Sequence, residues 1–522
     1  MKNQAKIFCL TENARRASLI APIFAPLLVL VSGALRNQQA DNLLPAFFST
    51  DRLSWFYWDQ SRYGSIHSFL AFPIQNIRMN LIFQLYLRAA SLIFLVVWIA
   101  ESCIRNDSFD SAKYVQRFFA LVFAATFLLT FQEAGDALIY GANAHPIAIP
   151  FAILALSVNH GKAESRFTVL RLSLMVILVA VFWGIAIWTS IFTALWAPAL
   201  VFLQLAHVSK SERVFQTKFA SWFALHVVVV GIWSWIFSQI AQSGGENTSF
   251  VRGRFISEAL KRTYISLPIA IYFAAAVVSL VTIVFTGRKI ADTFALLSSV
   301  CFVGSVPVIA ASTHVQAYSY MPRYFGVQYI SALLILLVVL SGLIRIGRIE
   351  RLFDLIKLPR RQLIIALMVV SIVTITATSM SKIEFGTGKV DASGFVNTGH
   401  GISSDLESEL LAKLGNDLQF VAGSYWYVWP AVFDLRSRGS EVVAITKKAS
   451  HQSQFPNLYS SLPIQGLCIG ESIRCWSATI NAQLNESQLF SEIDSVIIGN
   501  LVDGTPIRKM WVSKYPIRIL ER

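Results

Sequence analysis

The chain has 522 residues, of which 55% are hydrophobic and only 14% are charged, and its mean hydropathy is +0.56. Soluble globular proteins carry about 25% charged residues, so a soluble enzyme of this composition would have to expose large apolar patches. The composition therefore excludes that class. The net charge of +14 divides into +15 for residues 1–381 and −1 for residues 382–522. The basic excess thus accompanies the apolar runs and does not indicate a nucleic-acid partner.

Apolar runs near 20 residues with few or no charges recur along the first 380 residues, and each has the length of a helix that spans a bilayer. We expect a polytopic α-helical membrane protein with about eleven transmembrane helices. In chain order they are predicted over 17–35, 81–103, 116–131, 144–158, 169–187, 190–207, 219–240, 265–286, 292–311, 326–344 and 362–380.

The distribution of lysine and arginine between the loops predicts the orientation. With the N-terminus in the cytoplasm, the inner loops hold 21 of these residues and the outer loops hold 9. Because basic residues concentrate in cytoplasmic loops, we expect a cytoplasmic N-terminus. An odd number of spans then places the end of the chain outside.

Residues 381–522 differ in character from the membrane domain, 1–380. Short apolar runs that are typical of strands occur at Leu418–Ala422, Glu441–Ile445 and Ser495–Ile498, between polar and helical segments. We therefore expect an extracytoplasmic α/β domain. Cys468 and Cys475 lie in it, where oxidation can join them, and the spacing leaves open whether they form a disulfide.

The long first outer loop, 36–80, contains the segment Asp51–Ser65, which holds two carboxylates, two arginines and a group of aromatic residues. Aromatic faces can stack on a sugar ring, while carboxylates and amides bind its hydroxyls. The alternative is an amphipathic interfacial helix with an aromatic belt, which is common in membrane proteins. Composition alone leaves both interpretations open.

The same segment resembles the first outer loop of multi-spanning bacterial proteins with a D-x-L-x-x-F-Y-W-G-Q-x-R-x-G-like pattern, which are similar to the GT-C glycosyltransferase superfamily. That superfamily includes protein mannosyltransferases and lipid A aminoarabinose and galacturonic acid transferases. The matching positions are Asp51, Leu53, Phe56, Tyr57, Trp58, Gln60, Arg62 and Gly64. Asp59 departs from the pattern, which has glycine there.

The resemblance implies that the acidic residue soon after the first span, Asp51, is the catalytic base or orients the acceptor, with Asp59 as second choice. An inverting transfer needs such a carboxylate to deprotonate or orient the acceptor while the sugar leaves its lipid phosphate. Trp55, Tyr57 and Trp58 would form walls against the sugar, with Gln60 beside them, and Arg62 would contact the phosphate. A retaining reaction would require a second, closer carboxylate.

Two further outer segments add candidates. Glu133 and Asp136 could steer an acceptor or hold a divalent ion, although no metal or other cofactor is indicated, and His145-Pro146 resembles the start of a GT-C span. Helix capping is the alternative for this segment. Arg323-Tyr324 resembles a late-span motif in which arginine neutralises the lipid phosphate; the alternative is an arginine that snorkels to the head groups.

These features favour a GT-C-like glycosyltransferase in the bacterial cytoplasmic (inner) membrane. It would transfer a sugar from a polyprenyl-phosphate donor to an envelope glycan, lipid or protein acceptor on the outer side. The expected partners are that donor, membrane lipids and the acceptor. The alternatives are a non-enzymatic membrane protein, such as a transporter, flippase or envelope-assembly factor, and a family member that has lost its activity.

Overall fold

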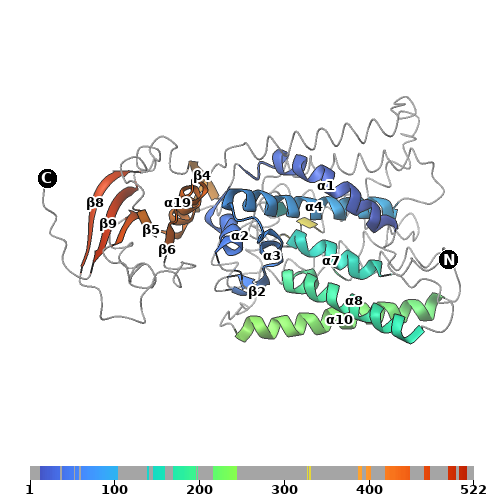
Figure 1. Cartoon of the computed structure of the whole chain (residues 1–522). Helices are drawn as coiled ribbons and strands as arrows, with labels where there is room; N and C mark the ends of the chain where they lie inside the picture. Colours follow the sequence, from blue (N-terminus) through green and yellow to red (C-terminus); the bar gives the residue numbers. More distant parts are fainter. Residues whose placement is uncertain are drawn as a thin grey trace, which may run out of the picture. The chain divides into compact units, whose positions relative to one another are not determined.

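The computed structural model (Figure 1) describes residues 12–35, 38–51, 53, 55–57, 60–103, 138–139, 145–158, 168–194, 197, 215–243, 326, 329–330, 386–390, 396–400, 418–446, 464–470, 492–500 and 505–513. The predicted spans 116–131, 265–286, 292–311 and 362–380, and most of 190–207 and 326–344, lie outside these residues. The chain divides into two compact units. Unit 1 is 1–34, 54–67 and 84–380, and unit 2 is 35–53, 68–83 and 381–522.

Five long apolar helices occur where the sequence predicts spans. They are α1 (Glu12–Val31), α4 (Ile77–Cys103), α7 (His145–Ser157), α8 (Thr168–Thr189) and α10 (Phe215–Ser243). All of these except the shorter α7 are long and apolar enough to cross a bilayer, because about 20 helical residues span the hydrocarbon core. The prediction of a multi-pass α-helical membrane protein is therefore confirmed.

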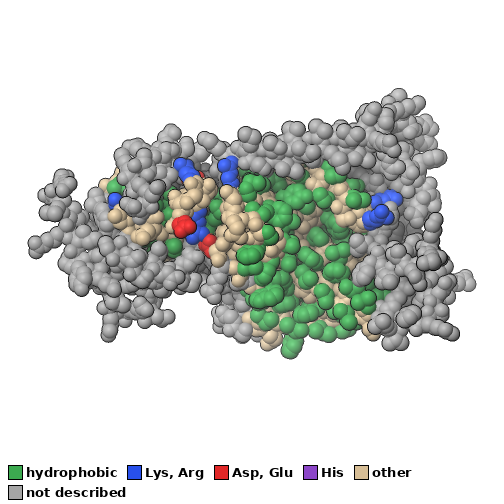
Figure 2. Space-filling model, viewed as in Figure 1, with side chains coloured by type: hydrophobic (Ala, Val, Ile, Leu, Met, Phe, Trp, Pro, Cys, Tyr) green, Lys and Arg blue, Asp and Glu red, His purple; other side chains and the backbone are tan. Residues whose placement is uncertain are grey.

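Within unit 1, α8 contacts both α7 and α10 (Figure 1). The indole Nε1 of Trp183 donates to Nδ1 of His226 at 2.8 Å, and Nε1 of Trp233 donates to the carbonyl of Ala180 at 2.9 Å. Large apolar side chains of α8 and α10 point outward, as expected of surfaces that face lipid, and Figure 2 shows hydrophobic side chains covering this face of the helices. Among them are Leu172, Ile177, Val181, Val228, Ile232 and Trp235.

The first outer loop folds into regular elements. It contains helix α2 (Ala40–Thr50), the antiparallel strands β1 (Phe56–Tyr57) and β2 (Gln60–Gly64), and the short helix α3 (Ile66–Ala71). The alternative of an interfacial helix over 51–65 is therefore wrong. Tertiary packing accounts for the difference, because a Cβ at Gly64 would lie 2.5 Å from the Trp188 ring, so glycine lets β2 approach α8.

The described part of 381–522 contains a mixed five-stranded sheet with strand order β6-β5-β7-β9-β8. Strand β5 (Leu418–Gly423) pairs in parallel with β6 (Val443–Thr446) and β7 (Ile464–Ile469), whereas β9 (Pro506–Ser513) is antiparallel to β7 and to β8 (Glu492–Asn500). Strands β5, β6 and β8 overlap the three runs predicted as strands. A separate pair joins β3 (Gly386–Val390) to β4 (Val396–His400).

Helix α19 (Tyr425–Ser437) connects β5 to β6 and contacts both strands, which forms a βαβ unit. Gly423 ends β5 with a φ of +139°, a conformation that glycine adopts without strain, and the helix starts two residues later. The chain therefore changes from strand to helix between Gly423 and Tyr425. Cys468 in β7 is disulfide-bonded, while Cys475, the candidate partner, lies outside the described residues.

Candidate functional site

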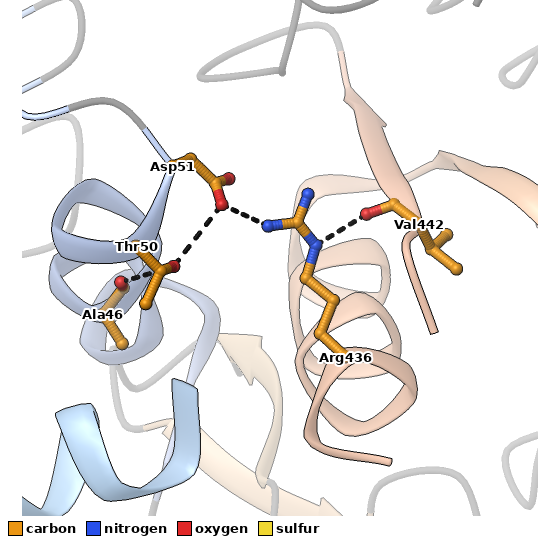
Figure 3. A network of polar contacts seen from close by, with 5 residues as sticks. All are labelled: Ala46, Thr50, Asp51, Arg436 and Val442. Carbon is orange, nitrogen blue, oxygen red and sulfur yellow. Dashed lines mark hydrogen bonds and ion pairs between the residues drawn. The ribbon is translucent and has the colours of Figure 1, made fainter. Parts of the chain in front are cut away.

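Asp51 is the C-cap residue of α2, and its backbone N–H donates to the carbonyl of Phe47 at 2.8 Å. Its side chain is only 6% exposed and forms an ion pair with Arg436, from Nη1 of the guanidinium to Oδ1 of the carboxylate. The Thr50 hydroxyl lies 3.4 Å from the same oxygen and 3.1 Å from the carbonyl of Ala46 (Figure 3). The candidate base is therefore a largely buried carboxylate that is held by a defined cation.

Arg436 lies in the last turn of α19 and is positioned by two contacts besides Asp51. Its Nε donates to the carbonyl of Val442 at 2.7 Å (Figure 3), and its guanidinium carbon lies 5.5 Å from the centroid of the Phe47 ring. A cation over an aromatic face is attracted by the ring quadrupole. The arginine is thus anchored to the backbone next to β6 and to α2 at the same time.

The contact between α2 and α19 has polar interactions at both ends and aromatic packing between them. The ring of Phe47 meets Trp429 edge-on at 4.6 Å and Phe433 at 6.1 Å. Near the helix starts, the hydroxyl of Tyr425 donates to Asp41, while Asp51 and Arg436 meet at the helix ends. The N-terminal ends of the two helices lie together and so do their C-terminal ends, so α2 and α19 run parallel.

A buried hydrogen-bond network fixes the other side of α2. The Asn80 amide donates to Oγ of Ser49 at 2.9 Å and to the carbonyl of Ala71 at 3.0 Å. The Ser49 hydroxyl in turn donates to the carbonyl of Ser68 at 2.8 Å, and the Ser68 hydroxyl donates to that of Pro45 at 3.1 Å. Satisfied buried polar groups of this kind hold a unique geometry, so Asp51 extends from a rigid helix.

The aromatic candidates lie on the hairpin of unit 1. Trp55 is 70% exposed and its ring lies 5.7 Å from that of Trp188, at a tilt of 59°. Tyr57 belongs to β1, and Gln60 and Arg62 belong to β2. An exposed tryptophan beside a second indole has the chemistry of a stacking surface for a sugar ring. Trp58 and Asp59 lie outside the described residues.

His145 begins α7 and is buried in unit 1. Its Nδ1 lies 2.5 Å from the Ser190 hydroxyl, and its ring meets Phe192 edge-on at 5.4 Å. The contact joins the start of α7 to the segment that follows α8. Glu133, Asp136, Arg323 and Tyr324 lie outside the described residues.

Near the hairpin, His67 of α3 is also buried. Burial, and then the positive charge of Arg88, lower its pKa well below the usual value. Arg88 is itself almost fully buried, and its Nη1 donates to the carbonyl of Ile139 at 3.3 Å. Because a buried imidazolium beside a guanidinium would be costly, His67 is neutral at pH 7. No group of three His, Cys, Asp or Glu suited to a metal ion occurs among the residues that the structure describes.

Sequence reasoning missed Arg436. An arginine in the last turn of an apolar helix complements the helix dipole, which is an ordinary reason for its presence, and it lies 385 positions from Asp51. The only local signal is its spacing from Trp429 and Tyr425, which places all three on one helical face.

No protein-family model matches the sequence, and neither does any curated protein. The chain is similar to two solved structures of ArnT from Cupriavidus metallidurans. One is bound to undecaprenyl phosphate (13% identity, TM-score 0.45) and the other is in the apo state (13% identity, TM-score 0.44). In both cases the similarity covers 94% of this chain and 97% of the other. At this identity neither structure assigns a role to a residue of this chain.

Proposed function

We propose that the chain is a GT-C-like glycosyltransferase that takes a sugar from a polyprenyl-phosphate donor. It transfers the sugar to an envelope glycan, lipid or protein on the outer side of the bacterial cytoplasmic membrane, with inversion at the anomeric carbon. The proposal starts from the matched pattern in the first outer loop of a multi-pass membrane protein. Its residues supply a carboxylate to act on the acceptor hydroxyl, aromatic surfaces to bind the sugar and an arginine to bind the donor phosphate.

The placement of Asp51 carries the proposal. The carboxylate ends a helix that is buried along its length and fixed by the Asn80 network, so its position is well defined, as catalysis by a base requires. Its contacts with Arg436 and Thr50 are made at Oδ1, and a carboxylate in a fixed position is the kind of group that takes the proton of an incoming hydroxyl in such a transfer.

The other residues take their proposed roles from the first outer loop and from the two further outer segments. Trp55, Tyr57 and Trp58 would bound the sugar, Gln60, Asp136, His145 and Tyr324 would contact sugar or acceptor, and Arg62 and Arg323 would bind the donor phosphate, since a guanidinium forms two-point contacts with phosphate oxygens. Asp59 and Glu133 would assist Asp51.

A non-enzymatic membrane protein is the second candidate, and one observation favours it. The Asp51–Arg436 ion pair, together with Phe47, fastens α2 to α19, which gives the carboxylate a purely structural task. In that case Asp51 would matter for stability and for nothing else.

Mass spectrometry of envelope glycans and lipids from cells with and without the gene distinguishes the two candidates. We expect one modified species to disappear with the gene. Asp51→Asn should lower its formation by about 10²–10⁴-fold, the usual contribution of an acid–base group, at unchanged protein abundance on an immunoblot. Asp434→Asn is the matched control, because Asp434 lies two residues before Arg436 on α19 and pairs with the exposed C-cap residue Arg438, at 2.9 Å. Full activity of Asp51→Asn would exclude Asp51 as the base.

A further inference from the structure

Arg436 is oriented by groups that do not belong to the candidate site. The Val442 carbonyl fixes Nε at 2.7 Å and the Phe47 ring lies against the guanidinium at 5.5 Å. A guanidinium is planar, so fixing one nitrogen and one face fixes the direction of the remaining N–H groups. The contacts with Val442 and Phe47 therefore orient the guanidinium so that its Nη1 points toward Oδ1 of Asp51.

Asp51 depends on this cation more than a typical aspartate does. It lies at the C-terminal end of α2, where the helix dipole disfavours a negative charge, and its side chain is almost fully buried. Asp41, in the first turn of the same helix, has the favourable polarity and is bound by the neutral hydroxyl of Tyr425. The dipole of α2 therefore disfavours the Asp51 carboxylate at this end of the helix, and the charge of Arg436 offsets that cost.

We infer that Arg436 is a positioning residue for the Asp51 carboxylate, so that helix α19 of the C-terminal segment is a required part of the catalytic apparatus. This inference rests on the proposed function. Arg436 compensates the buried charge, holds Oδ1 in one place and thereby directs the carboxylate toward the acceptor hydroxyl. Arg436 itself does not contact the sugar or the phosphate.

The test compares four variants of the full-length protein in cells that lack the chromosomal gene. They are Arg436→Ala, Arg436→Lys, Tyr425→Phe and Arg438→Ala, and the readout is the amount of modified envelope species per unit of membrane-inserted protein. Tyr425→Phe breaks the other polar end of the α2–α19 contact without touching Asp51. Arg438→Ala removes an arginine from the same helix end that is 41% exposed and pairs with Asp434.

We expect Arg436→Ala to lower the yield by about 10²-fold, as a misplaced catalytic group does, and Tyr425→Phe and Arg438→Ala to stay near wild type. Arg436→Lys keeps the charge but lacks the planar fork and the Val442 anchor, so it should recover about tenfold over Arg436→Ala and remain below wild type. Combining Arg436→Ala with Asp51→Asn should lower the yield no further than Asp51→Asn alone, since Arg436 acts through Asp51.

Three results would overturn the positioning role: a wild-type yield from Arg436→Ala, an equal loss from Tyr425→Phe, or a wild-type yield from Arg436→Lys. If Arg436→Ala does not accumulate in the membrane, the yield of Arg436→Lys tests the positioning role instead, because this variant retains the buried charge. Failure of the proposed function looks different, because cells with and without the gene would then contain the same glycans and lipids. That result would remove both proposals together.

Discussion

Replacing Phe47 by alanine tests whether the α2–α19 contact holds the candidate base in place. The side chain is fully buried and touches the three residues that define the contact, namely Trp429, Phe433 and Arg436. The substitution removes the centre of the contact and leaves both polar ends chemically intact. Any change therefore reports on the packing of Phe47 and on its cation–π contact with Arg436.

The magnitude follows from burial and from the cavity that remains. Transfer of a buried phenylalanine from water contributes about 1.5–3 kcal/mol, and the cavity raises the total cost of Phe→Ala to about 3–5 kcal/mol. The edge-on pair with Trp429 at 4.6 Å and the cation–π contact with Arg436 place Phe47 toward the upper part of that range.

Hydrogen exchange of the detergent-solubilised protein measures this energy locally. The amides of α19 should exchange faster by about 10³-fold, because the upper part of that range is about 4–5 kcal/mol and each 1.4 kcal/mol corresponds to about tenfold in the opening equilibrium. Phe72→Ala is the matched control: Phe72 lies in the same unit but is 47% exposed, so protection of α19 should change little. Unchanged protection in Phe47→Ala would refute the conclusion that α2 supports α19.

Two further predictions concern unit 1. Gly64→Ala places a Cβ 2.5 Å from the Trp188 ring and should lower the free energy of unfolding by about 1–3 kcal/mol. Gly231→Ala places a Cβ inside helix α10 with nothing within 4 Å of it, and should raise the free energy of unfolding by up to about 1 kcal/mol. Thermal unfolding in detergent measures both variants, and equal stability of the two would contradict the packing of Gly64 against Trp188. Burial and Arg88 lower the pKa of His67 in the folded protein, so as the pH falls the imidazole becomes protonated in the unfolded chain before it does in the folded one. His67 should therefore lower the free energy of unfolding by up to about 1.4 kcal/mol per pH unit below about 6.5, the pKa of an unfolded histidine. Unfolding followed between pH 7.5 and 5 in wild type and His67→Gln should show a shallower loss in the variant, and parallel curves would contradict a neutral buried imidazole.

Local patterns predicted the elements that depend on local physics. A run of about 20 apolar residues forms a helix in a bilayer, because a helix lets one segment satisfy all of its own backbone groups there, and α1, α4, α8 and α10 lie where those runs occur. Strands β5, β6 and β8 follow from short apolar runs in the same way. Helix starts were less predictable: α4 begins at Ile77, four residues before the expected 81, because its first turn packs in unit 2 with the outer loop.

The structure of the first outer loop could not be predicted from local sequence patterns. Its composition fits both an interfacial helix and a sugar-binding loop, and the close approach of the β1–β2 hairpin to Trp188 requires glycine at position 64. The identity of Asp51 as a candidate came from its place in a motif of adjacent residues. Nothing in that motif refers to the cation it meets.

The sequence by itself determined that this is a multi-pass membrane protein with a strand-containing C-terminal segment, and it singled out Asp51, since hydropathy, periodicity and short motifs are properties of neighbouring residues. Only the tertiary structure decided that α2 runs parallel to α19 and that Arg436, 385 positions away, holds the Asp51 carboxylate. The physical reason is that a contact between distant segments depends on how complete helices and sheets pack, and no local property of either segment encodes its partner.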